Sequence, residues 1–247
     1  MSDVVVVTGG SRGIGAATAV MLAARGHDVC LSYLEHGDAA GQVVAACEAA
    51  GVTARSVRAD VSVEIDVLEL FTAAEEMGRV AGLVNNAGVL ARQSRVVDLD
   101  AERIERLLQV NVLGAFLCAR EAVHLMSTRL GGEGGAIVNV SSRAAVLGGP
   151  GEYVDYAASK AAVDALTVGL AKEVAAEGIR VNGVRPGLIR TDIHASGGEP
   201  GRVDRLRDSV PLLRGGEPDE VAEAICWLLS DAASYVTGST LDVSGGR

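Results

Sequence analysis

The sequence lacks the features that would mark a membrane or secreted protein. No apolar run approaches the ~20 residues that a membrane-spanning helix needs, and Val4 to Val7 is a typical run. Met1-Ser2-Asp3 leads directly into this strand-like run, with no basic segment or cleavage site of a secretory signal. These absences favour a cytoplasmic protein with no membrane partner.

Positive charge is scarce. The chain has 22 Lys and Arg against 32 Asp and Glu, which gives a formal net charge of −10. Nucleic acids and anionic membranes are bound by clustered Lys and Arg, so this balance argues against either partner. A small-molecule partner is favoured instead.

Spacings typical of metal ligands are also missing. Cys30, Cys47, Cys118 and Cys226 are far apart and form no Cys-x-x-Cys, and the four histidines form no His-x-x-x-His. Each cysteine lies in an apolar stretch, which is typical of a buried free thiol. We therefore expect no metal site and no disulfide.

What the sequence does have is an alternation of strand-like and helix-like segments. Hydrophobic residues make up 49% of the chain and charged residues 22%, as in a folded protein. Val163, Leu166 and Leu170 show the helical spacing. The alternation predicts an α/β fold: a doubly wound, seven-stranded parallel sheet with helices on both faces, in a single domain over residues 1–247. The expected strands are Val4–Thr8, Asp28–Tyr33, Ala54–Ala59, Gly82–Asn85, Ala136–Ser141, Arg180–Arg185 and Thr240–Val243.

One long stretch, Leu188 to Gly216, has no strong periodicity and is rich in Gly and Arg. An irregular segment of this length in a compact domain is usually a lid or a binding loop. We expect it to be the substrate loop, at about residues 188–216.

A glycine-rich turn follows the first expected strand and opens the first expected helix. In Thr8-Gly9-Gly10-Ser11-Arg12-Gly13-Ile14-Gly15, glycines allow the backbone to approach a pyrophosphate that faces the free N–H groups of the helix. The turn predicts nucleotide binding through Gly9, Ser11, Arg12, Gly13, Ile14 and Gly15. Asp60-Val61 ends the third expected strand, where the carboxylate could accept a hydrogen bond from an adenine amine, cap a helix, or do both.

Tyr156 and Lys160 are four residues apart on an expected helix, so they share one helix face. A free phenol titrates near pH ~10, and a neighbouring positive charge favours its ionised form. This makes Tyr156 a candidate acid or base. Tyr153 has no lysine four residues on, so we expect it to be a wall of the pocket.

Six motifs in order make the whole chain resemble the short-chain dehydrogenase/reductase family, a family of Rossmann-fold oxidoreductases. The motifs are Thr8-Gly9-x-x-x-Gly13-x-Gly15, Asn85-Asn86-Ala87-Gly88, Asn111, Ser141-Ser142, Tyr156-x-x-x-Lys160 and Pro186-Gly187. Within the family the chain is similar to bacterial glucose 1-dehydrogenase-like and 3-oxoacyl-reductase-like proteins. The resemblance implies an NAD(P)-dependent enzyme that interconverts a ketone and a secondary alcohol.

The resemblance also implies four catalytic residues. Tyr156 would be the general acid/base, because reduction of a ketone leaves negative charge on its oxygen. Lys160 would lower the pKa of the phenol and bind the nicotinamide ribose. Ser142 would hydrogen-bond the same substrate oxygen. Asn111 would anchor a water that links Lys160 to solvent, or it would be only a polar residue that bends its helix.

Further cofactor contacts follow from the same resemblance, besides those of Tyr156 and Lys160. Small residues after the fourth expected strand would leave room for the cofactor, and the segment after the sixth would meet the nicotinamide carboxamide. These residues are Asn86, Ala87, Gly88, Pro186, Gly187, Ile189 and Thr191. The resemblance further implies a homotetramer, and the expected helices at Tyr156–Glu177 and Ala101–Met126 carry small residues that suit close packing.

The residues that bear on the choice between NADP and NAD point in different directions. NAD enzymes of this fold place an acidic residue at the end of the second strand, but Tyr33 occupies that position here. Arg12 can hold a 2′-phosphate through a forked, charge-assisted hydrogen bond, and His36 could add a donor if protonated. Glu35 lies near the same strand end and would favour NAD. We expect NADP, with NAD as the alternative.

Two other functions remain open at this point. The chain could be a nucleotide-binding regulator that has lost turnover, against which the complete set Asn111, Ser142, Tyr156 and Lys160 argues. It could also be an epimerase or dehydratase of nucleotide sugars. Those relatives usually carry a longer C-terminal substrate domain than the segment after Pro186 provides.

Overall fold

The strands form one sheet at the centre of the molecule. The computed structural model describes residues 3–247, so Met1 and Ser2, part of the segment considered for a signal, lie outside the described residues. All seven strands are parallel, in the order β3-β2-β1-β4-β5-β6-β7. Their bounds are β1 Asp3–Val7, β2 Asp28–Tyr33, β3 Ala54–Arg58, β4 Arg79–Asn85, β5 Gly135–Val140, β6 Ile179–Pro186 and β7 Thr240–Val243.

The predicted seven-stranded, doubly wound sheet is confirmed. Predicted and observed strand ends agree to within one residue except at β4, which begins at Arg79 rather than Gly82. The apolar run from Val4 to Val7 is buried because helices cover both faces of a parallel sheet.

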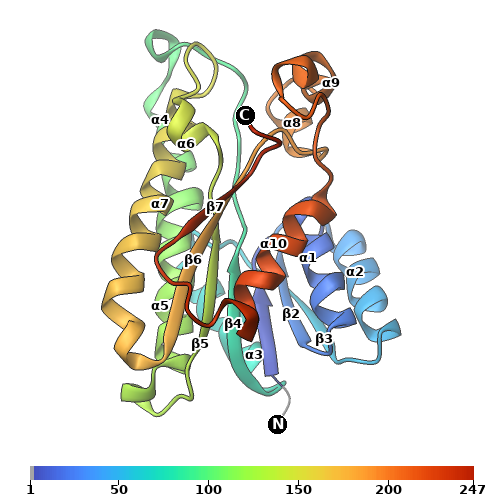
Figure 1. The fold of residues 1–247 in the computed structure, drawn as a ribbon, viewed down its shortest axis with the longest axis vertical. Helices are drawn as coiled ribbons and strands as arrows, with labels where there is room; N and C mark the ends of the chain where they lie inside the picture. Colours follow the sequence, from blue (N-terminus) through green and yellow to red (C-terminus); the bar gives the residue numbers. More distant parts are fainter. Residues whose placement is uncertain (1–2) are drawn as a thin grey trace.

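Helices pack on both faces of the sheet (Figure 1). On one face, α1, α2 and α10 bury residues such as Leu22, Val43 and Ile225 against the sheet. On the other face, α3, α5 and α7 bury Leu70 and Met126 in a second core. The helices of these layers are α1 Gly13–Ala24, α2 Gly37–Ala49, α3 Glu64–Glu75, α5 Gly114–Met126, α7 Val154–Val174 and α10 Pro218–Leu229.

The predicted helix Ala101–Met126 is interrupted. It consists of α4 Ala101–Leu108, a π-helical turn at Gln109–Leu113 and then α5. The predicted helix Tyr156–Glu177 corresponds to α7 followed by a 3₁₀ turn at Ala175–Glu177.

The stretch Leu188–Gly216 is less irregular than its sequence indicates. It contains α8 Ile193–Ser196, α9 Arg202–Leu206 and a 3₁₀ turn at Arg207–Ser209. The helices are too short to show periodicity in sequence. The remaining short elements are α6 Ala144–Leu147 and 3₁₀ turns at Val96–Asp98, Thr128–Leu130 and Asp231–Ala233.

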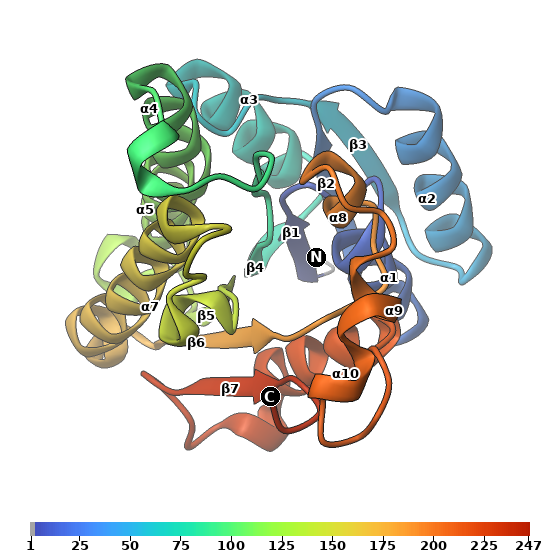
Figure 2. The same ribbon diagram turned by 90° about the horizontal axis from the view of Figure 1, so that it is seen from above.

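The strand order places the carboxyl ends of all seven strands at one edge of the sheet. Strand order reverses between β1 and β4, and in such sheets ligands bind in the crevice at this switch point. Figure 2 looks down on this end and shows α8 and α9 on one side of it, with α4 and α7 on the other.

Two further observations concern residues 3–247 as a whole. All four cysteines are free and buried, as predicted. No helix in this range is both long and apolar enough to cross a membrane.

Candidate active site

A cavity of about 780 Å³ lies at the carboxyl ends of the strands. Its wall contains residues that follow all seven strands, from Gly9 after β1 to Arg247 after β7. The volume is within the range of small-molecule sites. The cavity therefore lies at the edge of the sheet where this topology predicts ligand binding.

The turns after β1 and β4 are tied together at one end of this cavity. The Asn86 side chain donates to the carbonyls of Thr8 (2.8 Å) and Gly9 (3.0 Å). In return, the Thr8 hydroxyl accepts from the backbone N–H groups of Asn86 and Ala87, both at 3.0 Å. These bonds hold the glycine turn in one shape from the neighbouring strand.

The glycines of the turn are required by its geometry. Gly9 and Gly13 have φ of 63° and 55°, in the left-handed region. A Cβ on Gly15 would lie 2.4 Å from the Gly9 carbonyl oxygen, so no larger residue fits there. A Cβ on Gly13 would meet the Thr191 methyl at 3.2 Å, which brings the segment after β6 against the turn.

Helix α1 begins at Gly13, directly after the turn. Its N-cap residue is Arg12, and no side-chain hydrogen bond caps the helix. The first-turn N–H groups and the helix dipole thus suit an anion. The Arg12 guanidinium is exposed, lines the cavity and has no hydrogen bond or ion pair with any described residue.

Asp60 lies beyond the end of β3 in the cavity wall. Its carboxylate accepts from the Ser62 N–H (3.0 Å), the Ser62 hydroxyl (2.6 Å) and the Arg106 guanidinium (3.0 Å). Burial raises the pKa of Asp60, but these hydrogen bonds outweigh it and lower the pKa below its ordinary value. The N-cap residue of α3 is Val63, so Asp60 does not cap this helix.

Tyr156, Lys160 and Ser142 share another part of the same wall. Ser142 leaves β5, and the two other residues lie one turn apart on α7. The Lys160 ammonium is buried, donates to the Val140 carbonyl (2.8 Å) and lies 5.8 Å from the centre of the Tyr156 ring. A phenol, a hydroxyl and an ammonium therefore converge at one end of the cavity.

Burial controls the pKa values of this pair. It raises the pKa of Tyr156 to about 12, against the opposing effect of the Ser142 hydroxyl. It lowers the pKa of Lys160 to about 8, which the charge of Asp164 partly offsets. The pKa of the phenol is therefore above its ordinary value in this structure, because burial outweighs the lowering that we expected from Lys160.

Asn111 lies in the π-helical turn and does not line the cavity. Its side chain exchanges two hydrogen bonds with the backbone of Val89 (2.8 and 3.0 Å) and donates to the Ser159 hydroxyl (3.0 Å). A Cβ on Gly88 would lie 3.3 Å from both the Asn111 amide oxygen and the Lys160 nitrogen. Asn111 thus links the segment after β4 to α7, close to Lys160.

The segment after β6 closes the cavity from the other side. Pro186, Gly187, Ile189 and Thr191 all line it. The buried His194 donates from Nε2 to the Ile189 carbonyl at 2.9 Å, which fixes the orientation of this peptide group. Burial lowers the pKa of His194, so its ring is neutral near pH 7.

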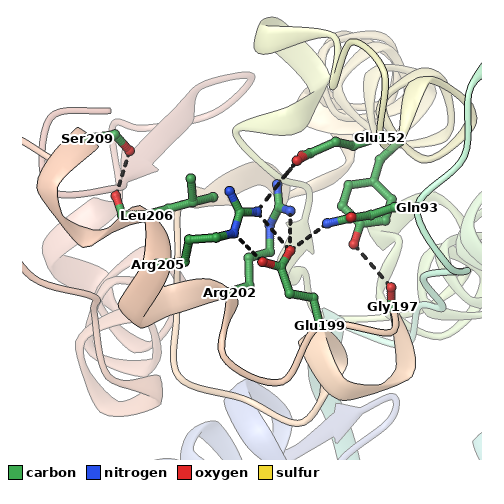
Figure 3. A network of polar contacts seen from close by, with 9 residues as sticks. Gln93, Glu152, Gly197, Glu199, Arg202, Arg205, Leu206 and Ser209 are labelled. Carbon is green, nitrogen blue, oxygen red and sulfur yellow. Dashed lines mark hydrogen bonds and ion pairs between the residues drawn. The ribbon is translucent and has the colours of Figure 1, made fainter.

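A network of charged groups lies at α9 (Figure 3), and two of its members, Glu152 and Arg202, line the cavity. Arg202 is paired with both Glu152 and Glu199, and Arg205 is also paired with Glu199. Gln93 donates to Glu199 at 2.5 Å. The Arg205 guanidinium in particular lowers the pKa of Glu199 to about 2. Three segments far apart in sequence are joined here.

Tyr153 lies beneath this network as a wall of the cavity. Its hydroxyl donates to the Gly197 carbonyl (3.3 Å), and the Arg202 guanidinium lies 5.0 Å from the centre of its ring. Tyr153 is therefore a residue of the cavity wall, as the sequence predicts.

Most of the predicted site residues meet in this one cavity. Gly15 and Asn111 support it from behind instead. The predicted residues that line it are Gly9, Ser11, Arg12, Gly13, Ile14, Tyr33, Asp60, Val61, Asn86, Ala87, Gly88, Ser142, Tyr156, Lys160, Pro186, Gly187, Ile189 and Thr191. The wall also contains Ser32, Arg106, Arg143 and Arg247, which belong to no predicted motif.

Comparisons with known proteins show the family to which the chain belongs. A family model described as enoyl-(acyl carrier protein) reductase matches residues 9–247. The oxidoreductase YgfF of Escherichia coli K12 is 58% identical over 245 residues, covering 99% of each chain.

Two solved structures share the fold over nearly their whole length. A short-chain dehydrogenase from Burkholderia cenocepacia in complex with NADP has a TM-score of 0.90 and 35% identity, covering 98% of this chain and 96% of the other. The 3-ketoacyl-(acyl-carrier-protein) reductase of Brucella melitensis, complexed with NADH, has a TM-score of 0.91 and 33% identity, covering 99% and 98%. The chain therefore belongs to the short-chain dehydrogenase/reductase family of oxidoreductases.

Proposed function

We propose that the protein interconverts a ketone and a secondary alcohol with NADP, using Tyr156 as general acid and base. One observation carries the proposal. The Tyr156 phenol, the Ser142 hydroxyl and the buried Lys160 lie in the same cavity as the glycine turn at the start of α1. Residues 188–216 serve as the substrate loop.

The residues present fit a dinucleotide. The glycine turn and the uncapped start of α1 suit its pyrophosphate, and Asp60 suits the adenine. Gly88 leaves room beside Lys160 that a Cβ would fill. When bound, the nicotinamide would supply or accept the hydride, and the Ile189 peptide and Thr191, which line the cavity, would hold its carboxamide.

The remaining chemistry belongs to the side chains. With its pKa raised to about 12, Tyr156 is protonated at neutral pH and can donate a proton to a substrate oxygen that gains negative charge. Ser142 hydrogen-bonds the same oxygen. The Lys160 ammonium stabilises the phenolate that remains, and Asn111 holds the backbone beside Lys160 in place.

Substrate pairs test the proposal directly. Ketones and the corresponding alcohols are assayed with NADPH or NADP by nicotinamide absorbance, with NADH and NAD in parallel. Turnover of at least one pair is expected. Cofactor binding without turnover across a broad panel would favour a regulator, and activity on nucleotide sugars alone would favour an epimerase or dehydratase.

Arg12 is expected to set the preference for NADP. Its guanidinium has no partner among the described residues, and a hydrogen bond to a charged group is worth about 1.5–3 kcal/mol. Arg12→Ala should therefore weaken NADP binding by about ten- to a hundredfold and leave NAD binding unchanged. The dissociation constants of both cofactors are the measurement.

Arg55→Ala is the matched control, because Arg55 pairs with Glu76 away from the cavity. A wild-type kcat/KM higher for NADH than for NADPH would contradict the NADP preference. It would point to Glu35, which also lines the cavity, as an acceptor for the ribose.

We further propose that the protein is a cytoplasmic homotetramer. Apolar side chains that are more than a third exposed gather on the layer of α4, α5 and α7, including Leu108, Phe116 and Val168. Others lie at α10 and β7, including Trp227 and Leu241. Two separate apolar faces suit the two kinds of contact in a symmetric tetramer. The four buried free thiols fit a reducing compartment.

Light scattering at micromolar protein should give about four times the 25.2 kDa chain mass. Phe116→Glu should split the assembly, because it buries a charge in a contact between helices. Ala45→Glu, on the exposed side of α2 and away from α4, α5, α7, α10 and β7, should leave the mass unchanged. A wild-type monomer would refute the tetramer.

A further inference from the structure

The charged network at α9 extends to a residue in the segment after β7. Arg247 is partly buried and lines the cavity, as do Glu152 and Arg202. The pKa of its guanidinium is affected by the charges of Arg202, Glu152 and Arg205. The backbone of Arg247 is fixed, since its carbonyl oxygen accepts from the Arg143 side chain at 2.6 Å.

One of the guanidinium groups in this network has no partner. Three guanidinium groups, from Arg202, Arg205 and Arg247, face two carboxylates, from Glu152 and Glu199. Both carboxylates are already paired with Arg202 and Arg205. The Arg247 guanidinium has no hydrogen bond or ion pair with any residue of the described chain. Arg247 therefore presents an unpaired guanidinium to the cavity, next to the Arg202 and Glu152 charges.

A partly buried guanidinium that has no hydrogen-bond or ion-pair partner favours the binding of an anion. Burial and the neighbouring Arg202 charge both lower the pKa of Arg247, although Glu152 opposes this effect. A guanidinium presents a fork of donors that matches carboxylate and phosphate oxygens. Asp192 also lies in the wall, but it follows Thr191 at the glycine-turn end and is not among the groups acting on Arg247.

We propose that Arg247 binds an anionic group of the substrate, so that the substrate is a ketone or alcohol carrying a carboxylate or a phosphate. The inference rests on the proposed function, in which Tyr156 and Ser142 hold the reacting oxygen. Arg143 connects the two ends, because it directly follows Ser142 and fixes the Arg247 backbone. Arg247 determines specificity and takes no part in proton transfer.

Matched substrates that differ only in charge test this. The carboxylate pair is 4-oxopentanoate and 4-oxopentanamide, and the phosphate pair is dihydroxyacetone phosphate and dihydroxyacetone. The wild type should favour the anion of at least one pair in kcat/KM. Arg247→Gln should reduce that preference by about ten- to a hundredfold, as expected for a lost charge-assisted hydrogen bond. The pair with the larger loss identifies the anionic group.

Two further variants control for effects of charge and folding. Arg247→Lys keeps the charge and should retain part of the preference. Arg207→Gln removes a positive charge from the exposed end of the same loop and should leave the preference intact. An equal preference in wild type and Arg247→Gln would overturn the proposal.

A binding measurement tests the anion site at Arg247 even if no substrate is turned over. Benzoate and benzamide are titrated calorimetrically into the NADP-loaded protein. Benzoate should bind the wild type more tightly than benzamide, and Arg247→Gln should weaken benzoate alone by tenfold or more. If no ketone or alcohol is turned over but this pattern holds, the proposed reaction fails and the anion site stands. Benzoate binding that does not depend on Arg247 would remove the anion site.

Discussion

Tyr156→Phe should lower turnover at least ~100-fold and leave the cofactor dissociation constant close to that of the wild type. The substitution removes the proton donor, and general acid catalysis contributes about 10²–10⁴ in rate. The glycine turn and its bonds to Asn86 stay as they are, because none of these bonds involves the Tyr156 hydroxyl. Steady-state kcat and a fluorescence titration with NADPH measure the two quantities separately.

Tyr153→Phe is the matched control for this substitution. It removes one hydroxyl from the same wall, together with its hydrogen bond to Gly197. We expect it to change kcat only a few-fold, with its larger effect on KM. Activity of Tyr156→Phe within a few-fold of wild type would refute the assignment of the acid.

Lys160→Ala should damage both turnover and cofactor binding. In the proposed mechanism the Lys160 ammonium stabilises the phenolate of Tyr156 and also binds the nicotinamide ribose. We expect kcat to fall by ~10²-fold or more and cofactor affinity to fall by about tenfold. The same two measurements apply. An unchanged cofactor dissociation constant would remove the ribose role.

The pH profile gives an independent measure of Lys160. Burial lowers its pKa to about 8, so the side chain is charged below that pH and neutral above it. Ketone reduction should therefore decline as the pH rises through about 8 in the wild type, and this inflection should be absent in Lys160→Ala. Lys172→Ala, an exposed lysine on the same helix, should keep both the rate and the inflection.

The sheet could be predicted because its strands are short apolar runs separated by helical segments. The cavity wall could be predicted wherever a motif follows a strand, as at Gly9, Asn86 and Pro186, since parallel strands bring their carboxyl ends to one edge. Local sequence was sufficient for these positions.

Features that depend on packing between distant segments could not be predicted. The π-helical turn at Asn111 interrupts a continuous helical pattern, and nothing in the spacing marks it. The raised pKa of Tyr156 depends on burial by the whole site. Arg247 lies 60 residues beyond the last of the six motifs, Pro186-Gly187, and it reaches the cavity only through the fold.

The π-helical turn at Gln109–Leu113 also sets the rotational phase of α5 relative to α4. Each residue advances an α-helix by about 100°, so the wider turn shifts every later side chain around the helix axis. If the same five residues adopted regular α-helix, with none deleted, α5 would rotate by nearly that angle. Cys118, Ala122 and Met126 would then leave the core, so the turn that seats Asn111 also aligns the hydrophobic face of α5.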